Sequence, residues 1–205
     1  MARVNWRPSN LLSPVPAVLI TCTDENGRHN VMTAAWAGTI CSDPVMVSVS
    51  IRKSRFSHDI IAKSKQFVMN LTNEQLVMFT DYAGIYSGKK VDKLAEDNPY
   101  NIHTIPAEKV NTVAIKESPI SLECEVKQIL ELGSHDMFIA EVVNVSIDDE
   151  YIDDQNRLDI KKAKLIAYCH GDYYAIGKKI GNFGYSSRKK ERNRRTNYKQ
   201  TTKKR

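Results

Sequence analysis

Residues 45–52, which read VMVSVSIR, constrain the fold more than any other stretch of this chain. β-Branched apolar residues stand at every second position, with mostly Ser and Arg between them. Because successive side chains of a strand point to opposite faces, this period predicts a strand with one face in a core. From Phe56 the spacing of apolar residues becomes that of a helix, and Ser54 or Ser57 is expected to cap its start.

Strand-like segments of the same kind dominate the rest of the chain. Asn26-Gly27 lies between two of them and is a strong hairpin signal. Residues 120–132 and 137–147 predict two long strands joined by a short turn. Thr72 and Gln75 have the spacing of a capping box, which predicts a second helix after them. Many strands, few helices and Gly or Asn turns predict a mainly β fold, a small antiparallel barrel with peripheral helices.

The positive charge of the chain is concentrated at one end. The 205 residues carry a formal net charge of +6, but residues 188–205 contain ten Lys or Arg and one Glu, a charge of +9. Residues 1–187 therefore carry −3 and form the single expected domain. Segment 188–205 has no apolar periodicity and is predicted to be a disordered basic tail. Such a tail would attract polyanions weakly and without sequence specificity.

Several protein classes are disfavoured by what the sequence lacks. No apolar run is long enough to cross a bilayer, and residues 1–10 lack the apolar segment of a signal peptide. The four Cys residues are widely separated, so the sequence predicts neither a metal site nor a disulfide framework. We therefore expect a protein of the reducing cytoplasm without membrane contact.

The end of the 45–52 strand and the start of the following helix are rich in hydroxyl and guanidinium groups. A phosphate group is bound by several donors together with positive charge, and the first turn of a helix supplies N–H groups and a positive dipole end. Arginine adds bidentate hydrogen bonds. This cluster predicts an anion site, with a solvated strand end and an ordinary cap as the alternative. It comprises Ser50, Arg52, Ser54, Arg55 and Ser57.

Small residues surround Trp36 in the segment 30–44, NVMTAAWAGTICSDP. Small side chains let the backbone approach a flat ligand closely, so that its amides can bond the polar edge of the ligand. A packed strand with a bulge is the alternative interpretation. Lys89, Lys90 and Lys93 in SGKKVDK would attract an anionic nucleotide, or they would belong to a solvated loop.

Several motifs, taken together and in order, carry a family resemblance over roughly residues 10–187. They are NVMTAAWAGTICSDPVMVSVSIRKSRFSHDII, FVMNL, SGKKVDK, IKESPISLECEV, ELGSHDMFIAEV and HGDYYAIGKKIGNFGYS. The chain resembles the flavin reductase-like, FMN-binding split-barrel family, most closely its flavoredoxin-like branch. The resemblance implies a six-stranded antiparallel split barrel of Greek-key type, and a homodimer with a flavin in each of two interface clefts.

The resemblance also implies which residues bind the flavin, namely FMN, with FAD as the alternative. The isoalloxazine ring would contact Thr33, Ala34, Ala35 and Trp36, and the phosphate would contact Ser50, Arg52, Arg55 and Ser57. His135, in the turn Gly133-Ser134-His135-Asp136, would place the nicotinamide or balance charge at the flavin. A polar hairpin-turn role is the alternative for His135. Asn70 would face the ribityl chain or form a turn.

The implied activity is that of an NAD(P)H-dependent flavin reductase. The nicotinamide, from NADH or NADPH, would transfer hydride to flavin N5, and the electrons would pass to a small-molecule or protein acceptor. The alternative is a flavoredoxin-like FMN electron carrier that a partner protein reduces in place of NAD(P)H. The protein contributes position and electrostatics in either case.

Overall fold

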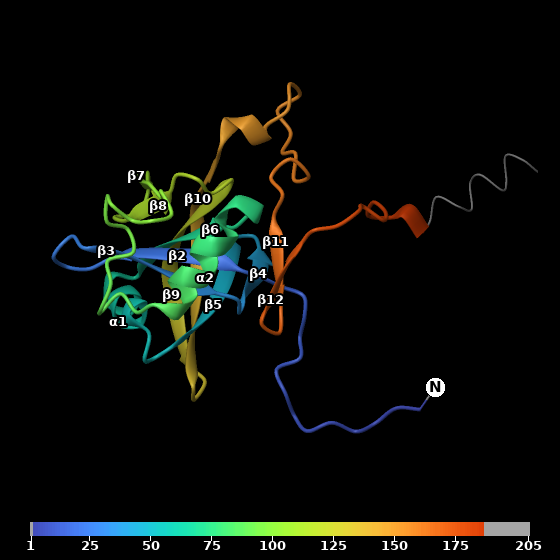
Figure 1. The fold of residues 1–205 in the computed structure, drawn as a ribbon, viewed down its shortest axis with the longest axis horizontal. Coiled ribbons are helices and arrows are strands. Elements are labelled where there is room, and N and C mark those ends of the chain that lie inside the picture. Colours follow the sequence, from blue (N-terminus) through green and yellow to red (C-terminus); the bar gives the residue numbers. More distant parts are fainter. Residues whose placement is uncertain (1, 187–205) are drawn as a thin grey trace, which may run out of the picture.

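Seven antiparallel strands form the central sheet in a computed structural model, which describes residues 2–186 (Figure 1). The strand order is β3-β2-β6-β9-β10-β5-β4. The predicted mainly β class is confirmed, although the sheet has one strand more than the six expected. The basic segment 188–205 lies outside the described residues. The seven strands are β2 (Val18–Thr23), β3 (His29–Ala34), β4 (Ala37–Ser42), β5 (Val45–Arg52), β6 (Gln66–Leu71), β9 (Ile120–Glu131) and β10 (His135–Ile147).

Smaller elements surround this sheet. Two α-helices and two short 3-10 helices connect or cover the strands, and two minor sheets lie beside them. The minor sheets consist of β1 (Val15–Pro16) with β11 (Ile166–Cys169) and β12 (Asp172–Ala175), and of β7 (Thr104–Pro106) with β8 (Val113–Ile115). The helices are α1 (Phe56–Ser64), η1 (Glu74–Leu76), α2 (Val77–Ile85) and η2 (Asp149–Tyr151).

The central sheet curls so that strands from its two ends share one core. Met32 of β3, Val49 of β5 and Phe138 of β10 belong to the same buried apolar cluster. β3 and β4 are the two outer strands, yet only two residues, Ala35 and Trp36, join them. The amide of Ser50 on β5 donates to the carbonyl of Trp36 at 2.9 Å, which ties this short connection to the sheet. The alternative interpretation of this segment as one packed strand with a bulge is therefore wrong, because Trp36 lies in a bend between two strands.

The start of α1 is where the sequence places it, but it is not capped as expected. Arg55 is the N-cap residue, in extended backbone conformation, and no side chain makes a cap hydrogen bond. Ser57 is 1% exposed, and its hydroxyl accepts a hydrogen bond from Asn30 Nδ2 at 2.6 Å. The expectation that Ser54 or Ser57 caps this helix is wrong, because Ser57 points into the protein.

The second helical segment is also capped by a neighbour of the expected residue. Asn73 Oδ1 accepts from the amide of Leu76 at 3.0 Å and caps η1, which continues into α2. The hydroxyl of Thr72 instead donates to the carbonyl of Ala17 at 2.7 Å. The predicted capping box is therefore wrong by one position, because the hydroxyl of Thr72, just after β6, bonds the chain just before β2.

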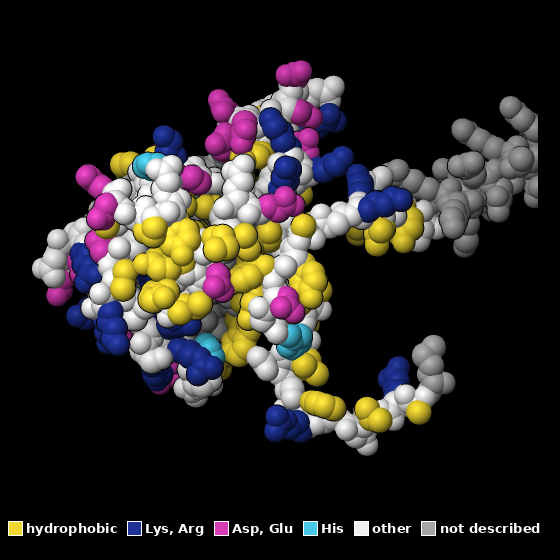
Figure 2. All heavy atoms as spheres, viewed as in Figure 1, with side chains coloured by type: hydrophobic (Ala, Val, Ile, Leu, Met, Phe, Trp, Pro, Cys, Tyr) yellow, Lys and Arg dark blue, Asp and Glu magenta, His cyan; other side chains and the backbone are white. Residues whose placement is uncertain are grey.

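α2 lies across one face of the sheet, as Figure 1 shows. Phe79 of α2 packs with Leu19 of β2 and Val31 of β3 in a second apolar cluster. Figure 2 shows a hydrophobic patch over α2 and the elements next to it. Acidic side chains gather in another place, over the segment that follows β10. Among residues 2–186, no helix is long and apolar enough to cross a membrane, and no cluster of potential metal ligands occurs.

Candidate functional site

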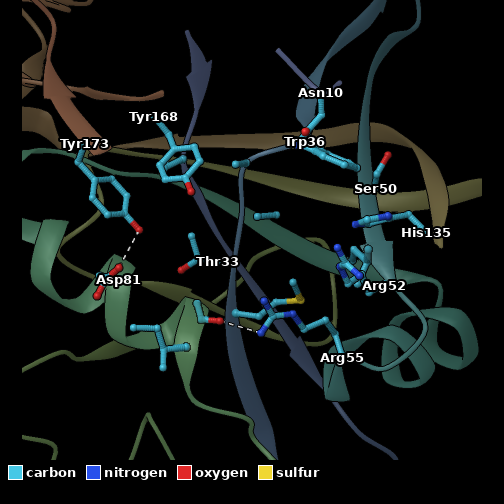
Figure 3. A pocket seen from close by; sticks show the side chains of 17 residues that line it. Asn10, Thr33, Trp36, Ser50, Arg52, Arg55, Asp81, His135, Tyr168 and Tyr173 are labelled. Carbon is cyan, nitrogen blue, oxygen red and sulfur yellow. Dashed lines mark hydrogen bonds between the residues drawn. The ribbon is translucent and has the colours of Figure 1, made fainter. Parts of the chain in front are cut away.

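A cavity of about 410 Å³ lies where β3, β5 and β10 meet the start of α1. Figure 3 shows that its basic side chains and its tyrosines stand on opposite sides. The volume falls in the range of about 300–1,000 Å³ that is typical of small-molecule sites. Of the flavin-site residues predicted from the sequence, all but Ser57 and Asn70 line the cavity: Thr33, Ala34, Ala35, Trp36, Ser50, Arg52, Arg55 and His135.

The basic wall of the cavity is built by three segments. Arg52 ends β5 and is the cross-strand partner of His135, which begins β10. Arg55 joins them from the N-cap of α1, and its Nη1 donates to the carbonyl of Gly84 at 2.7 Å. The positive end of the helix dipole adds to the charge of the two guanidinium groups. This corner therefore has the charge and the donors that an anion requires.

The imidazole of His135 is held against Trp36. Their ring centroids lie 4.5 Å apart and the planes are tilted by 37°. Burial lowers the pKa of His135, and the nearby charges of Arg52 and Arg55 lower it further. His135 is therefore a neutral imidazole at pH 7, able to accept or donate a hydrogen bond at the cavity wall.

The floor of the cavity is the end of β3 and the bend that follows it. Thr33 lines the cavity, and its hydroxyl donates to the carbonyl of Thr80 on α2. A Cβ atom built on Gly84 would lie 3.4 Å from Thr33 Cβ, so α2 approaches the floor closely at this glycine. Trp36 remains 46% exposed and presents a flat aromatic surface at the rim. Small residues and one exposed indole thus form a shallow platform.

The wall opposite the arginines contains side chains that sequence reasoning largely missed. Tyr173 Oη lies 3.3 Å from Asp81 Oδ1 of α2, and its ring centroid is 5.3 Å from that of Tyr168. Burial, together with the charge of Asp81, raises the pKa of Tyr173 to about 12. The sequence offers one signal for this wall, the pair Tyr173-Tyr174 after the turn at Gly171, and of these two residues Tyr173 lines the cavity while Tyr174 is exposed.

Two further residues lie elsewhere than the sequence suggested. Asn70 is fully buried and bonds the carbonyl of Leu19 and the amide of Ile115, so it joins strands and does not line the cavity. Ser57 is buried beneath Asn30. The expectation that Asn70 faces a ribityl chain is therefore wrong, and a phosphate contact by Ser57 remains a prediction.

Lys89 and Lys90 are exposed, as the interpretation of a solvated loop requires, but Lys93 of the same segment is buried, which corrects that interpretation for Lys93. The side chain is 3% exposed, and Nζ donates to the carbonyl of Tyr86 at 2.7 Å, just beyond α2. Burial lowers the pKa of Lys93 to about 8, and the charge of Arg55 acts in the same direction. Arg55 and Lys93 thus bind two carbonyls, those of Gly84 and Tyr86, at the C-terminal end of α2.

The arrangement suits a ligand with a terminal anion at one end and a flat, partly apolar body. The guanidinium groups of Arg52 and Arg55 would bind the anion. Trp36 and the small residues before it would contact the flat body, and exposed backbone amides would bond its polar edge.

Comparison with known proteins agrees with this geometry. The model of the flavin reductase like domain family matches residues 11–177. An uncharacterised protein of Archaeoglobus fulgidus is 30% identical over 150 residues, which cover 73% of this chain and 82% of that protein. The NADH-dependent flavin reductase StyB of Pseudomonas fluorescens is 29% identical over 126 residues, 62% of this chain and 67% of that enzyme.

A solved structure extends the likeness to three dimensions. Flavoredoxin of Desulfovibrio vulgaris (Miyazaki F) superposes with a TM-score of 0.83 at 29% sequence identity. The superposition covers 91% of this chain and 100% of flavoredoxin. The split-barrel fold is thus shared over nearly the whole described part of the chain.

Proposed function

The chain belongs to the flavin reductase-like domain family, and from this membership we propose that it binds FMN in the cavity beside Arg52 and Arg55. The observation that carries the proposal is that three features surround one cavity: two arginines, the N-terminal end of α1 and an exposed indole. A phosphate group is complementary to the first two features, and an isoalloxazine ring to the third. FAD is the alternative flavin.

The residues present fit such a cofactor. Arg52 and Arg55 would hold the phosphate, and Thr33, Ala34, Ala35 and Trp36 would line the ring. When bound, a flavin accepts hydride from a reduced nicotinamide and passes electrons onward. The chain's own contribution is to fix the ring against its backbone and to exclude water from one face. His135, as a neutral imidazole, would donate or accept one hydrogen bond beside the ring.

We propose that the protein is an NAD(P)H-dependent flavin reductase. Its similarity to an NADH-dependent flavin reductase supports this activity. The solvent-open rim at Trp36 supports it as well, because a nicotinamide needs access to one ring face. The decisive experiment is an absorbance spectrum of the purified protein, followed by titration with NADH and then NADPH without oxygen. Bleaching of the flavin band within turnover times is the expected result.

A flavoredoxin-like electron carrier is the second candidate. The superposition on a flavoredoxin over the whole length of that protein favours it. A carrier would be reduced by a partner protein and would not react with nicotinamide. A flavin spectrum that stays unchanged on addition of NADH or NADPH, but bleaches with dithionite, would favour the carrier and contradict the reductase. Absence of any bound or bindable flavin would contradict both.

The proposed form of the protein is a homodimer with the flavin site at its interface. Exposed apolar side chains along the outer strand β4 and the residues that flank it support this form, because Trp36, Ile40 and Val45 are each nearly half exposed and Trp36 also lines the cavity. An uncovered edge strand with such residues commonly pairs with another chain. Light scattering of the purified protein would test the dimer. Ile40→Glu should shift it toward the monomer, whereas the exposed control Ile105→Glu should not.

Two peripheral properties complete the proposal. The tail 188–205 would give weak, salt-dependent attraction to polyanions, and deleting it should abolish retention on heparin at low salt. Cys22, Cys41, Cys124 and Cys169 are all free thiols in the described part of the chain, which supports a reducing compartment such as the cytoplasm.

A further inference from the structure

A buried histidine–carboxylate pair lies directly behind the basic wall of the cavity. His58 Nε2 of α1 and Asp136 Oδ2 of β10 are 2.8 Å apart, and the residues are 8% and 4% exposed. The other ring nitrogen of His58 lies 2.8 Å from Asp59 Oδ1, whose side chain is 79% exposed. The imidazole therefore bridges an outer and an inner carboxylate.

Asp136 depends on this imidazole for its hydrogen bonding. Among the described residues, Asp136 Oδ1 is buried without a hydrogen-bond partner. The ammonium group of Lys53 lies 3.6 Å from this oxygen and is itself hydrogen-bonded to Glu131 at 2.8 Å. A buried carboxylate with so few partners is costly to desolvate. A protein in which well-packed apolar residues replace such a pair is often as stable as the original or more stable. Net stability alone is thus a weak explanation for the pair.

The position of the pair suggests what it does. Asp136 directly follows His135 on β10, and adjacent strand residues point to opposite faces. His135 accordingly faces the cavity and stacks on Trp36, while Asp136 points toward α1. On the helix, His58 lies three residues after Arg55, the N-cap residue that lines the cavity. The pair therefore connects the two elements that carry Arg55 and His135.

The same connection reaches Arg52. In the β5–β10 register His135 is opposite Arg52, and Asp136 is opposite Ile51. Fixing Asp136 to His58 thus fixes the distance between the helix start and the ends of both strands. Two guanidinium groups that bind one phosphate lose affinity for it sharply when either group is displaced by about 1 Å.

We propose that His58 and Asp136 are positioning residues that hold the start of α1 against β5 and β10, so that Arg55 and Arg52 converge on one anion. This inference rests on the proposed binding of FMN. It predicts that the pair matters for the phosphate end of the ligand and not for its ring.

The experiment compares dissociation constants for FMN and for riboflavin, which lacks the phosphate, by quenching of flavin fluorescence. The first variant is the apolar double substitution His58→Leu/Asp136→Leu, which keeps the space filled. FMN affinity should fall about tenfold, as expected for a misplaced charged hydrogen bond, with riboflavin affinity within about twofold of wild type. A folded double variant with unchanged FMN affinity, or with equal losses for both ligands, would overturn the proposal.

A conservative variant and a matched control separate positioning from general stability. His58→Gln keeps an N–H donor toward Asp136 and should keep most of the FMN preference, also where the double variant does not fold. A loss of FMN affinity of about tenfold or more in folded His58→Gln would overturn the proposal. Glu117→Gln removes the carboxylate from an exposed pair in which Oε1 lies 2.7 Å from His103 Nδ1, and it should leave both affinities unchanged. A drop in the FMN preference in this control would show a general effect and contradict the inference.

Failure of the underlying function gives a different result. If the wild-type protein binds FMN no better than riboflavin, the phosphate assignment itself is wrong, and the positioning role falls with it. If wild type prefers FMN and the folded double variant prefers it equally, the proposed function stands and only the positioning role fails.

Discussion

The imidazole of His135 stacks on the indole of Trp36, with ring centroids 4.5 Å apart. This contact joins the start of β10 to the bend between β3 and β4, and it lies beside the two arginines of the cavity. Binding of FMN as proposed would need such a fixed arrangement, because the ring and the phosphate would belong to one ligand.

The pKa of His135 should rise when a neighbouring positive charge is removed. Burial, Arg52 and Arg55 together hold this pKa below its ordinary value. Arg52→Ala removes one of the two charges, so the imidazole should take up its proton at a higher pH than in wild type. Titration of the His135 ring proton by NMR measures the change. An unaltered or lower pKa in the variant would show that the Arg52 charge does not reach the imidazole.

Loss of either arginine should weaken FMN binding selectively. Arg52→Ala and Arg55→Ala should each cost about 1–3 kcal/mol of FMN binding free energy, as expected for lost charged hydrogen bonds, and should affect riboflavin little. Isothermal titration of both ligands measures this difference. Equal losses for FMN and riboflavin would contradict the assignment of the phosphate to this corner.

The two arginine variants should differ in stability. Arg55 also bonds the carbonyl of Gly84 at the end of α2, whereas Arg52 is exposed at the end of β5. Arg55→Ala should therefore lower the free energy of unfolding by about 1 kcal/mol more than Arg52→Ala. Urea denaturation of the ligand-free proteins measures the difference. Equal stabilities would show that the bond to Gly84 contributes nothing measurable.

Stability should depend on the titration of Lys93. Its pKa is about 8 in the folded protein, against 10.5 for an unperturbed lysine. Between these values the unfolded chain binds more protons, so the free energy of unfolding rises with pH across this window. Relative to Lys93→Met, wild type should gain about 1–3 kcal/mol between pH 8 and pH 10.5, measured by urea denaturation. The exposed control Lys89→Met should show the same pH dependence of the free energy of unfolding as wild type. If wild type and Lys93→Met show the same pH dependence, the pKa of Lys93 is not lowered.

Gly88 should not tolerate a side chain. A Cβ atom there would overlap Asn30 Oδ1 and lie 2.7 Å from Phe56 Cδ1 at the start of α1. Gly88→Ala should therefore destabilise the protein by about 1–3 kcal/mol through overpacking. Thermal unfolding compares it with Gly177→Ala, where no atom lies within 4 Å of the added Cβ. Similar melting temperatures for the two variants would contradict this packing.

The sequence predicted the parts of the fold that depend on local period and turn chemistry. The alternation of apolar and polar residues up to Arg52 corresponds to β5, and Asn26-Gly27 lies in the turn between β2 and β3. The helix caps were missed because tertiary contacts decide them: Ser57 bonds Asn30, and Thr72 bonds Ala17. Local sequence does not contain those partners.

The candidate site shows the same division. Residues 33–36 and 50–55 are close in sequence and carry recognisable motifs, so their meeting was foreseeable from the family resemblance. Asp81, Tyr168 and the burial of Lys93 were not foreseeable, because they depend on how α2 and the β11–β12 hairpin pack over the sheet. The buried pair of His58 and Asp136 was missed for a similar reason, since 78 residues separate its members.

The two-residue link between β3 and β4 has a consequence for how such a site can diversify. This link joins β3 and β4, the two outer strands of the central sheet, by only two residues. The width of the cavity mouth at this side therefore depends on the geometry of the strands, because there is no long loop whose length could vary. Differences in ligand preference would then arise from the other segments that line the cavity, namely α2, the β11–β12 hairpin and the stretch around Asn10. The floor formed by residues 33–36 would stay constant, and the segments around it would vary.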